Sequence, residues 1–471
     1  MPDKKTFIRK VSSDVPEGWK RIGKLTPGLI WMVSSIGSGT ILFTPRIGAR
    51  YEYELLWMAL LVTVLIYIII REVGRFTIVT GKSIISGFSE LPGPRKWGLW
   101  IIFAPQLIAA FITVSGLAAL AGSTLISSIG GHPVVYALVV IAGCLLLVIS
   151  GKFPVFEKVA TVMAALLVAI SLVTAARVVS QWDAIGAGLV PSMPADFEIG
   201  FVLPWLGFYL AGAAGIIWYS YWVAAREYGG PLLTTEEINR LKAGTMEEDS
   251  GKVKSLKKWI SILNTTSLIG IVAGGLINVA FLVLGAELLA PEGIVPQGVE
   301  VADDLALLLS EVWGEIGRWF LLVSILIALL GSVLSNQDGY GRMFSDATLI
   351  VGREKIKRIS DRFAERYDIE AARKAPEKLY VSNFYRIVVT AMLPAAIYIW
   401  FHDPVEIMSL AGIISAIHIP FIIFGTIYLN KKLLPKNLQP NLVSYILFLT
   451  AGIFYFLLGL YQVAGLFGFE F

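Results

Sequence analysis

Apolar runs of about 20 residues recur along the chain from Leu29 to Phe467, and the charged residues gather in the segments between them. A run of this length crosses the hydrocarbon core of a bilayer when it folds as an α-helix. Only 16% of the residues are charged and 56% are hydrophobic, whereas a soluble chain needs a polar surface. Because a helix satisfies its own backbone groups inside lipid, the pattern predicts an all-α integral membrane protein.

We expect about eleven transmembrane helices, one for each apolar run. Their expected positions are 28–48, 54–72, 97–124, 132–150, 155–180, 200–226, 258–288, 315–338, 382–401, 406–429 and 441–466.

Basic residues alternate between the two sides that these spans define. Lys and Arg are frequent before the first span and between the eighth and ninth, but 122–133 contains none, and 285–315 carries only acidic charges. The positive-inside rule therefore predicts a cytoplasmic N-terminus. With eleven spans in the plasma (inner) membrane, the C-terminus is expected on the extracytoplasmic side.

Two spans contain small and hydroxyl-bearing residues at mid-membrane. Gly37-Ser38-Gly39-Thr40 interrupts the first span, and Gly212 to Gly215 interrupts the sixth. Such residues weaken a helix and free backbone groups, which membranes tolerate where the segment lines a cavity. Two broken helices five spans apart are typical of a carrier built from two five-helix repeats of opposite orientation around one site.

This repeat pattern divides the chain into four parts. The expected parts are an N-terminal segment 1–27, a first repeat 28–180, a second repeat 181–429 with cytoplasmic loops 227–257 and 339–381, and a final helix with the C-terminus at 430–471.

The interrupted spans and the tenth span supply the candidate substrate site. Backbone groups at the breaks, two aromatic side chains of the sixth span and a histidine at membrane depth could hold a solute. The candidates are Gly37, Ser38, Gly39, Thr40, Tyr209, Gly212, Ala214, Gly215, Trp218 and His418. Gln106, beside Pro105 in the third span, is a further polar candidate.

Several segments resemble the Nramp family of divalent-metal transporters. Gly37-Ser38-Gly39-Thr40 stands where that family has D-P-G-N, and the following segment ends in L-L-W at Trp57 with the same spacing. Gly274 to Leu284 and Ser409 to Phe421 are similar to its seventh and tenth helices. The resemblance implies the LeuT fold of the APC superfamily and proton-coupled transport of divalent metal ions.

The chain departs from that family at the metal ligands. The family's metal-binding Asp corresponds to Gly37 and its Asn to Thr40, and the sixth-helix M-P-H signature is absent. A divalent ion bound by neutral groups alone would keep an uncompensated charge in a low-dielectric cavity. Ile36 to Pro45 also resembles the I-G-S-G-I-F…P stretch of APC amino-acid transporters, where backbone N–H groups hold the substrate carboxylate.

The sequence therefore predicts a secondary-active transporter that works by alternating access. Its substrate is a small polar organic solute such as an amino acid, an anion, or a divalent metal ion in an altered site. The coupling ion is H⁺ or Na⁺, and no cofactor, metal ligand set or nucleic-acid partner is indicated. The alternative function is that of a sensor, a protein that keeps the transporter fold but no longer transports a solute. No enzyme motif such as H-E-x-x-H occurs, so catalysis is not expected.

Overall fold

The computed structural model describes residues 15, 37, 39–151, 153–210, 212–225, 232–247, 250–367 and 376–467. Within these residues the regular secondary structure is entirely helical, which confirms the predicted class. Ten described segments are long and apolar enough to cross a membrane, and a short helical segment before them belongs to the first predicted span. The chain is a multi-pass integral membrane protein.

Each long helix covers most or all of one predicted span, and α13 extends well beyond its span at both ends. They are α3 (Leu56–Thr80), α5 (Trp97–Ile129), α6 (Pro133–Ser150), α7 (Phe153–Val178), α12 (Gly251–Leu284), α13 (Val301–Tyr367), α16 (Pro404–Leu433) and α17 (Leu442–Leu466).

Three spans are composite. The described part of the first span is the π-helical turn η2 (Gly39–Phe43) followed by α2 (Thr44–Tyr51). The sixth is divided into α9 (Ile199–Phe208) and α10 (Ala213–Ala225). The ninth consists of α14 (Pro376–Ile387), the π-helical turn η8 (Val388–Met392) and α15 (Leu393–Trp400).

Short helical elements connect the spans. They are α4 (Ile84–Phe88), η3 (Pro94–Lys96), α8 (Trp182–Gly188), α11 (Thr235–Lys242), η4 (Gly285–Leu289), η5 (Ala290–Glu292), η6 (Gly298–Glu300) and η9 (Lys436–Leu438).

Helices extend into both of the predicted cytoplasmic loops. α12 begins at Gly251, inside the predicted loop 227–257, and α13 continues well beyond 338 into the predicted loop 339–381. α13 leaves helical geometry at Gly314 and again at Gly352. In the sequence, charged residues show where these segments leave the apolar layer of the membrane. The helix itself can continue beyond that point into water. Hydropathy alone therefore cannot find its end.

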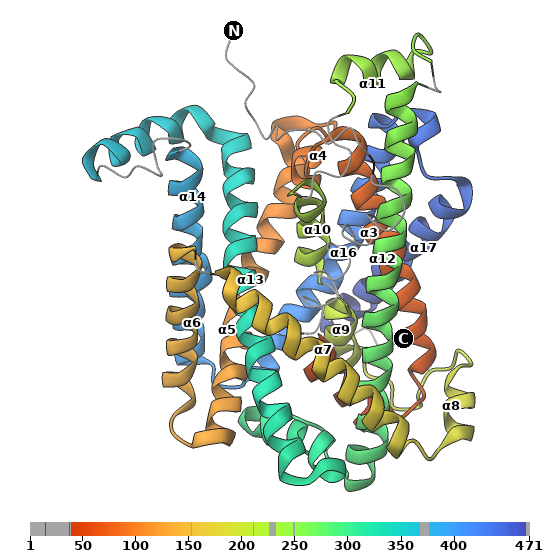
Figure 1. The fold of residues 1–471 in the computed structure, drawn as a ribbon, viewed down its shortest axis with the longest axis vertical. Helices are drawn as coiled ribbons and strands as arrows, with labels where there is room; N and C mark the ends of the chain where they lie inside the picture. The colour runs from red at the N-terminus through yellow and green to blue at the C-terminus, as the bar shows by residue number, and fades with distance from the viewer. Residues whose placement is uncertain are drawn as a thin grey trace.

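The connections separate onto two ends of the molecule. α4, α11 and the C-terminal part of α13 lie at one end, and α8 and the link between α12 and α13 lie at the other (Figure 1). The basic and acidic loops of the sequence are thus on opposite ends, as their alternation requires.

A buried ion cluster joins three helices at the end that carries α4 and α11. The carboxylate of Glu72 is fully buried in α3 and pairs with Arg71 at 2.9 Å and with Arg75 at 2.8 Å. Arg71 also contacts the Ser444 hydroxyl of α17, and the Asn430 amide of α16 donates to the Glu72 carbonyl at 3.2 Å. Paired and hydrogen-bonded in this way, a buried carboxylate can be tolerated.

The centre of the fold is the divided sixth span beside α16. α9 and α10 lie end to end in the middle of the molecule, with α16 alongside (Figure 1). Gly207 of α9 packs so closely on α16 that a Cβ atom there would lie 1.9 Å from the Gly412 carbonyl oxygen. Only a residue without a side chain permits this contact, which holds α9 against α16 just before the break.

Candidate substrate site

The break in the sixth span is a real interruption of the helix. α9 ends at Phe208, where Tyr209 takes an extended conformation, and α10 begins at Ala213. Leu210 between them has a positive φ of 58°, which is uncommon for a residue with a side chain. The predicted discontinuity of this helix is confirmed.

The first span is also irregular at the predicted place. Gly37 lies in a turn, and the chain then forms the π-helical turn η2 before it becomes regular in α2. Ser38 and the first part of this span, 28–36, lie outside the described residues.

The two irregular segments touch each other. A Cβ atom on Gly39 would lie 2.2 Å from the carbonyl oxygen of Phe208, so the two backbones are in direct contact at this point. The rings of Phe43 and Phe208 stack beside this contact, with centroids 6.2 Å apart. Residues that are far apart in the sequence therefore meet where both helices are interrupted, as the predicted site requires.

Ser415 of α16 bridges the two ends of the sixth-span break. Its hydroxyl donates to the carbonyl oxygen of Gly207 at 2.8 Å and accepts from the backbone N–H of Ala213 at 2.8 Å. Tyr455 of α17 donates to the Leu206 carbonyl at 3.3 Å. Two neighbouring helices thus satisfy backbone groups that the break releases. The sequence analysis did not assign Ser415 this role, since its partners are far apart in the chain.

Thr44 ties the first span to two other helices. Its hydroxyl accepts from the indole N–H of Trp205 at 3.0 Å and lies 2.8 Å from Oδ1 of Asn278. The Asn278 amide in turn donates to the Gly274 carbonyl at 2.8 Å. This chain of bonds is fully buried and joins α2, α9 and α12 beside the two breaks. Sequence reasoning missed it, because one threonine and one asparagine carry no distinctive motif.

The small residues predicted for the site gather at the breaks. Gly37, Gly39 and Thr40 are buried, whereas Gly212, Ala214 and Gly215 are partly exposed. These three residues of the sixth span are therefore not fully covered by neighbouring side chains.

The two predicted aromatic residues point away from one another. The Tyr209 hydroxyl bonds to Thr63 of α3 at 2.9 Å. The Trp218 ring packs on the backbone of Gly339 and meets the Tyr340 ring edge-on, with centroids 4.9 Å apart. Each ring packs against a neighbouring helix, Tyr209 against α3 and Trp218 against α13, so the two rings do not face each other across the site.

His418 and Gln106, the two polar candidates at membrane depth, form a pair. Nε2 of Gln106 lies 2.7 Å from Nδ1 of His418, and the exposed fractions of the two side chains are only 1% and 2%. His418 therefore faces α5, and the residue of α16 that contacts the break is Ser415, one turn earlier.

The site region contains few charges. Among the described residues, no group of three or more His, Cys, Asp or Glu side chains could hold a metal ion. The buried cation nearest in sequence to the first break is Arg46, which lies over the rings of Phe43 and Phe201. Its neighbour Arg50 pairs with Glu198 at 2.8 Å. The breaks themselves offer backbone groups and hydroxyls.

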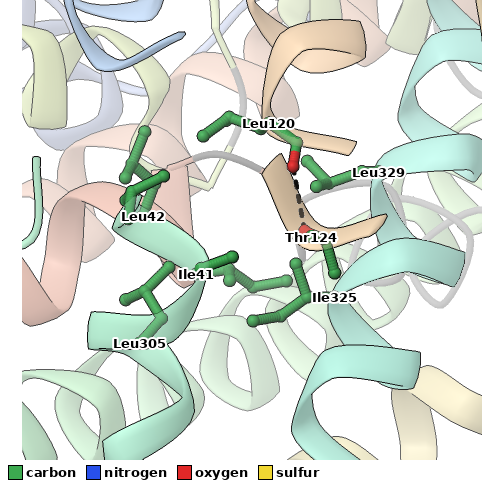
Figure 2. A pocket seen from close by; sticks show the side chains of 9 residues that line it. Ile41, Leu42, Leu120, Thr124, Leu305, Ile325 and Leu329 are labelled. Atoms are coloured by element: carbon green, nitrogen blue, oxygen red, sulfur yellow. Dashed lines mark hydrogen bonds between the residues drawn. The ribbon is translucent and has the colours of Figure 1, made fainter. Parts of the chain in front are cut away.

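A small cavity lies beside the first break, but it is not suited to a polar solute. Ile41 and Leu42 of η2 line it together with Leu120 and Thr124 of α5 and with residues of α13 (Figure 2). The Thr124 hydroxyl is engaged by the Leu120 carbonyl at 2.9 Å, so the lining is apolar. Its volume of about 10 Å³ is at most that of one water molecule, and such a space stays dry. The first span is therefore packed shut against α5 and α13 here.

An all-helical membrane protein with two interrupted helices meeting at its centre has the architecture of a secondary transporter, and comparison with known proteins supports this class. A family model described as natural resistance-associated macrophage protein-like (Nramp) matches residues 28–465. The chain belongs to this family. The predicted family and the LeuT-type fold are thereby confirmed.

Solved structures share the fold at low sequence identity. A mutant of the manganese transporter of Eremococcus coleocola is 14% identical with a TM-score of 0.66, over 97% of this chain and 91% of that one. Inward-facing Mhp1 is 14% identical with a TM-score of 0.52, over 92% and 89% of the two chains. MhsT in complex with L-phenylalanine is 15% identical with a TM-score of 0.51, over 95% and 98%.

One curated relative matches over a short segment. The metal transporter Nramp3 of Oryza sativa subsp. japonica is 30% identical over 102 residues, which are 21% of this chain and 18% of the rice protein. The match spans less than a fifth of that relative.

Proposed function

We propose that this transporter carries a small solute by alternating access, with the solute bound where the first and sixth spans are interrupted. The observation that carries the proposal is the contact of Gly39 with the Phe208 carbonyl, beside the partly exposed Gly212, Ala214 and Gly215. In transporters with discontinuous helices, backbone groups at the ends of the half-helices hold substrates and coupling ions. Gly37, Ser38 and Thr40 are proposed to complete the site.

The neutral character of the site favours a polar organic solute, such as an amino acid, over a bare metal ion. The described residues at the breaks provide N–H groups, carbonyls and hydroxyls, and a solute carboxylate can be held by N–H groups at a helix end. A divalent cation would be desolvated there without a carboxylate to balance its charge. A coupling ion, H⁺ or Na⁺, drives the cycle.

Divalent-metal transport is the second candidate, and family membership is the observation that favours it. Manganese transporters are among the solved structures with this fold, and a rice relative is a metal transporter. In this chain the ion would have to keep part of its hydration shell and rely on the Thr40 hydroxyl and backbone carbonyls, which suits a hard cation better than a soft one.

Uptake by purified protein in proteoliposomes distinguishes these functions. We expect saturable uptake of at least one amino acid from a radiolabelled panel, and no uptake of Mn²⁺ or Mg²⁺. Gly212→Ala should reduce solute uptake, because the added Cβ would lie 3.0 Å from the Ser415 hydroxyl. Gly465→Ala should leave uptake unchanged, because its Cβ would meet no atom within 4 Å.

Other outcomes of the same assay contradict the proposal. Saturable Mn²⁺ or Mg²⁺ uptake without amino-acid uptake would establish the second candidate. A solute that raises the melting temperature, as a bound ligand must, but crosses in no condition would identify a sensor.

We also propose that the end bearing α4 and α11 faces the cytoplasm, with the N-terminus on the same side and the C-terminus outside. The support is the concentration of Lys and Arg in the loops of that end.

A further inference from the structure

Arg46 is a buried cation that leaves part of its hydrogen-bonding capacity unused. It lies in α2, shortly after the first break, and its exposed fraction is 8%. Its Nε is buried without a hydrogen-bond partner among the described residues. Buried charges in proteins are normally paired and hydrogen-bonded, because desolvation of an unpaired charge is costly. The position of Arg46 therefore needs an explanation.

Asp403 balances the charge of Arg46 only from a distance. Its carboxylate attracts the guanidinium electrostatically, but none of the ion pairs among the described residues joins the two side chains. Oδ1 of Asp403 instead caps α16, where it accepts from the backbone N–H groups of Val405 and Glu406 at 2.8 and 2.9 Å. Electrostatic attraction acts over a distance, whereas a hydrogen bond needs contact. The Nε–H of Arg46 is therefore free to bind another group.

Arg50, the other cation of α2, has the carboxylate partners that Arg46 lacks. Both guanidinium groups lie 4.7 Å from the centroid of the same ring, that of Phe201 in α9. Arg50 has a side-chain exposure of 28%, pairs with Glu198 at 2.8 Å and lies 3.9 Å from Asp196. An exposed ion pair adds little stability, whereas a buried charge without a partner in contact is costly. Stability alone would favour a carboxylate beside Arg46, so the arrangement indicates a function.

The guanidinium of Arg46 lies one aromatic ring away from the contact between the interrupted spans. It sits over Phe43, 5.8 Å from the ring centroid, and the Phe43 ring stacks on that of Phe208. The carbonyl of Phe208 is the group that Gly39 meets where the two breaks touch. A ring over the face of a guanidinium leaves the N–H groups at its edge available to a ligand.

We propose that Arg46 binds the carboxylate of the transported solute, and that the solute is an organic anion, a class that includes the acidic amino acids. The inference rests on the proposed transport function and narrows its substrate class. The Nε–H group and the neighbouring Nη–H group of a guanidinium form a fork that matches the two oxygens of a carboxylate. The carboxylate would supply the contact that Asp403 does not make.

The charges of the two interrupted spans support an anion over a cation or a zwitterion. Segments 39–51 and 199–225 contain two charged residues, Arg46 and Arg50, and no Asp or Glu. A divalent cation near the breaks would be repelled by the guanidinium of Arg46, and the ammonium group of a zwitterion would find no carboxylate in either segment. A solute with a net negative charge is attracted and meets neither difficulty.

Equilibrium binding to the purified full-length protein tests the inference. The probes are pairs of solutes with nearly the same shape that differ by one negative charge: glutamate and glutamine, aspartate and asparagine, and succinate and succinamate. In at least one pair we expect the acid to bind about tenfold to a hundredfold more tightly than the amide, the range for a hydrogen bond to a charged group. Equal or tighter binding of the amide in every pair, or no binding of any acid, overturns the proposal.

Two variants of Arg46 assign the preference to its side chain. R46Q should bind the acid no more tightly than the amide. R46K keeps the charge but not the fork, so it should retain the preference and bind the acid several-fold more weakly. A preference that survives in R46Q, or an acid affinity unchanged in R46K, contradicts the assignment. If R46Q does not fold, the wild-type pairs and R46K still decide.

Arg177→Gln is the matched control for these variants. The Arg177 guanidinium also lies over an aromatic ring, 4.8 Å from the centroid of Trp313, but the residue is exposed and belongs to α7. The acid-to-amide ratio should not change in this variant. A ratio that falls as far as in R46Q would show that the protein responds to its overall charge and not to a carboxylate site at Arg46.

Uptake into proteoliposomes separates this inference from the proposed transport function. If a neutral or zwitterionic solute enters the vesicles and no acid is preferred over its amide, the anion site is wrong and the transport function stands. If the acids bind with the expected dependence on Arg46 but cross in no condition, the transport function fails and the anion site stands.

Discussion

At the scale of single residues, the interrupted segments are connected to neighbouring helices by the neutral hydroxyl groups of Thr44 and Ser415, and not by charged side chains. Thr44 and Ser415 each connect helices that are far apart in the sequence, through hydrogen bonds of 2.8–3.0 Å. A hydroxyl both donates and accepts, so one small side chain can satisfy two backbone or side-chain groups in a space that excludes water. This keeps the centre polar without placing a charge in it.

Thr44→Val tests how much the buried chain of bonds contributes to stability. Valine has nearly the same shape but leaves the Trp205 indole N–H and the Asn278 amide oxygen without partners. We expect a loss of about 1–3 kcal/mol, the usual cost of a buried unsatisfied group. The melting temperature of the purified protein should fall accordingly. Thr44→Ser keeps the hydroxyl and should lose much less; if both variants are equally destabilised, the loss comes from packing and not from hydrogen bonding.

At the scale of the element, α9 and α16 are held together by glycine contacts. Gly207 faces the Gly412 carbonyl, and Gly412 in turn lies against the backbone of Pro204. Small residues let two membrane helices approach closely, which strengthens their packing where the hydrophobic effect does not act. The half-helix α9 is thereby fixed to α16 at the end that forms the break.

Gly207→Ala should separate these helices. Its methyl group would lie 1.9 Å from a backbone oxygen, so one helix must move. We expect destabilisation of about 1–3 kcal/mol, as for other overpacked sites, together with reduced uptake. Gly143→Ala in α6 is the matched control, because its Cβ meets no atom within 4 Å and alanine is the better helix former. An unchanged melting temperature in Gly207→Ala would show that the contact is looser than described.

At the scale of the whole molecule, the two ends differ in charge and in how they are closed. The end bearing α4 and α11 carries the basic loops and the buried Glu72 cluster. Toward the other end, Tyr53 donates to the Glu287 carboxylate at 2.6 Å, and the Glu287 carboxylate also accepts from the Ser180 hydroxyl at 2.6 Å. Both ends are thus fastened by polar contacts between helices.

The proposed orientation predicts which of two cysteines a membrane-impermeant thiol reagent can reach in intact cells. In a Cys144→Ala background, Glu292→Cys should be labelled and Lys242→Cys should not, because the two exposed positions lie at opposite ends. Lys242→Cys should react once the cells are broken. Labelling in the reverse order would place the basic end outside and refute the assignment.

Much of the architecture was predictable, because it follows from local composition. The spans, the divided sixth helix and the irregular first helix are visible in apolar runs and in glycines at mid-membrane. The ends of α12 and α13 were not predictable, since a helix can continue into water after its apolar residues stop. Ser415, Thr44 and Asn278 were missed as site residues, because their importance lies in which distant groups they reach.

The sequence alone determined that this protein resides in a membrane, crosses it many times and has two weak points in its helices, since lipid imposes these demands on each segment separately. Only the tertiary structure decided that the two weak points touch, that Ser415 spans the gap and that His418 faces Gln106. These facts depend on how helices far apart in the chain pack against one another, and hydropathy and spacing carry no information about that packing.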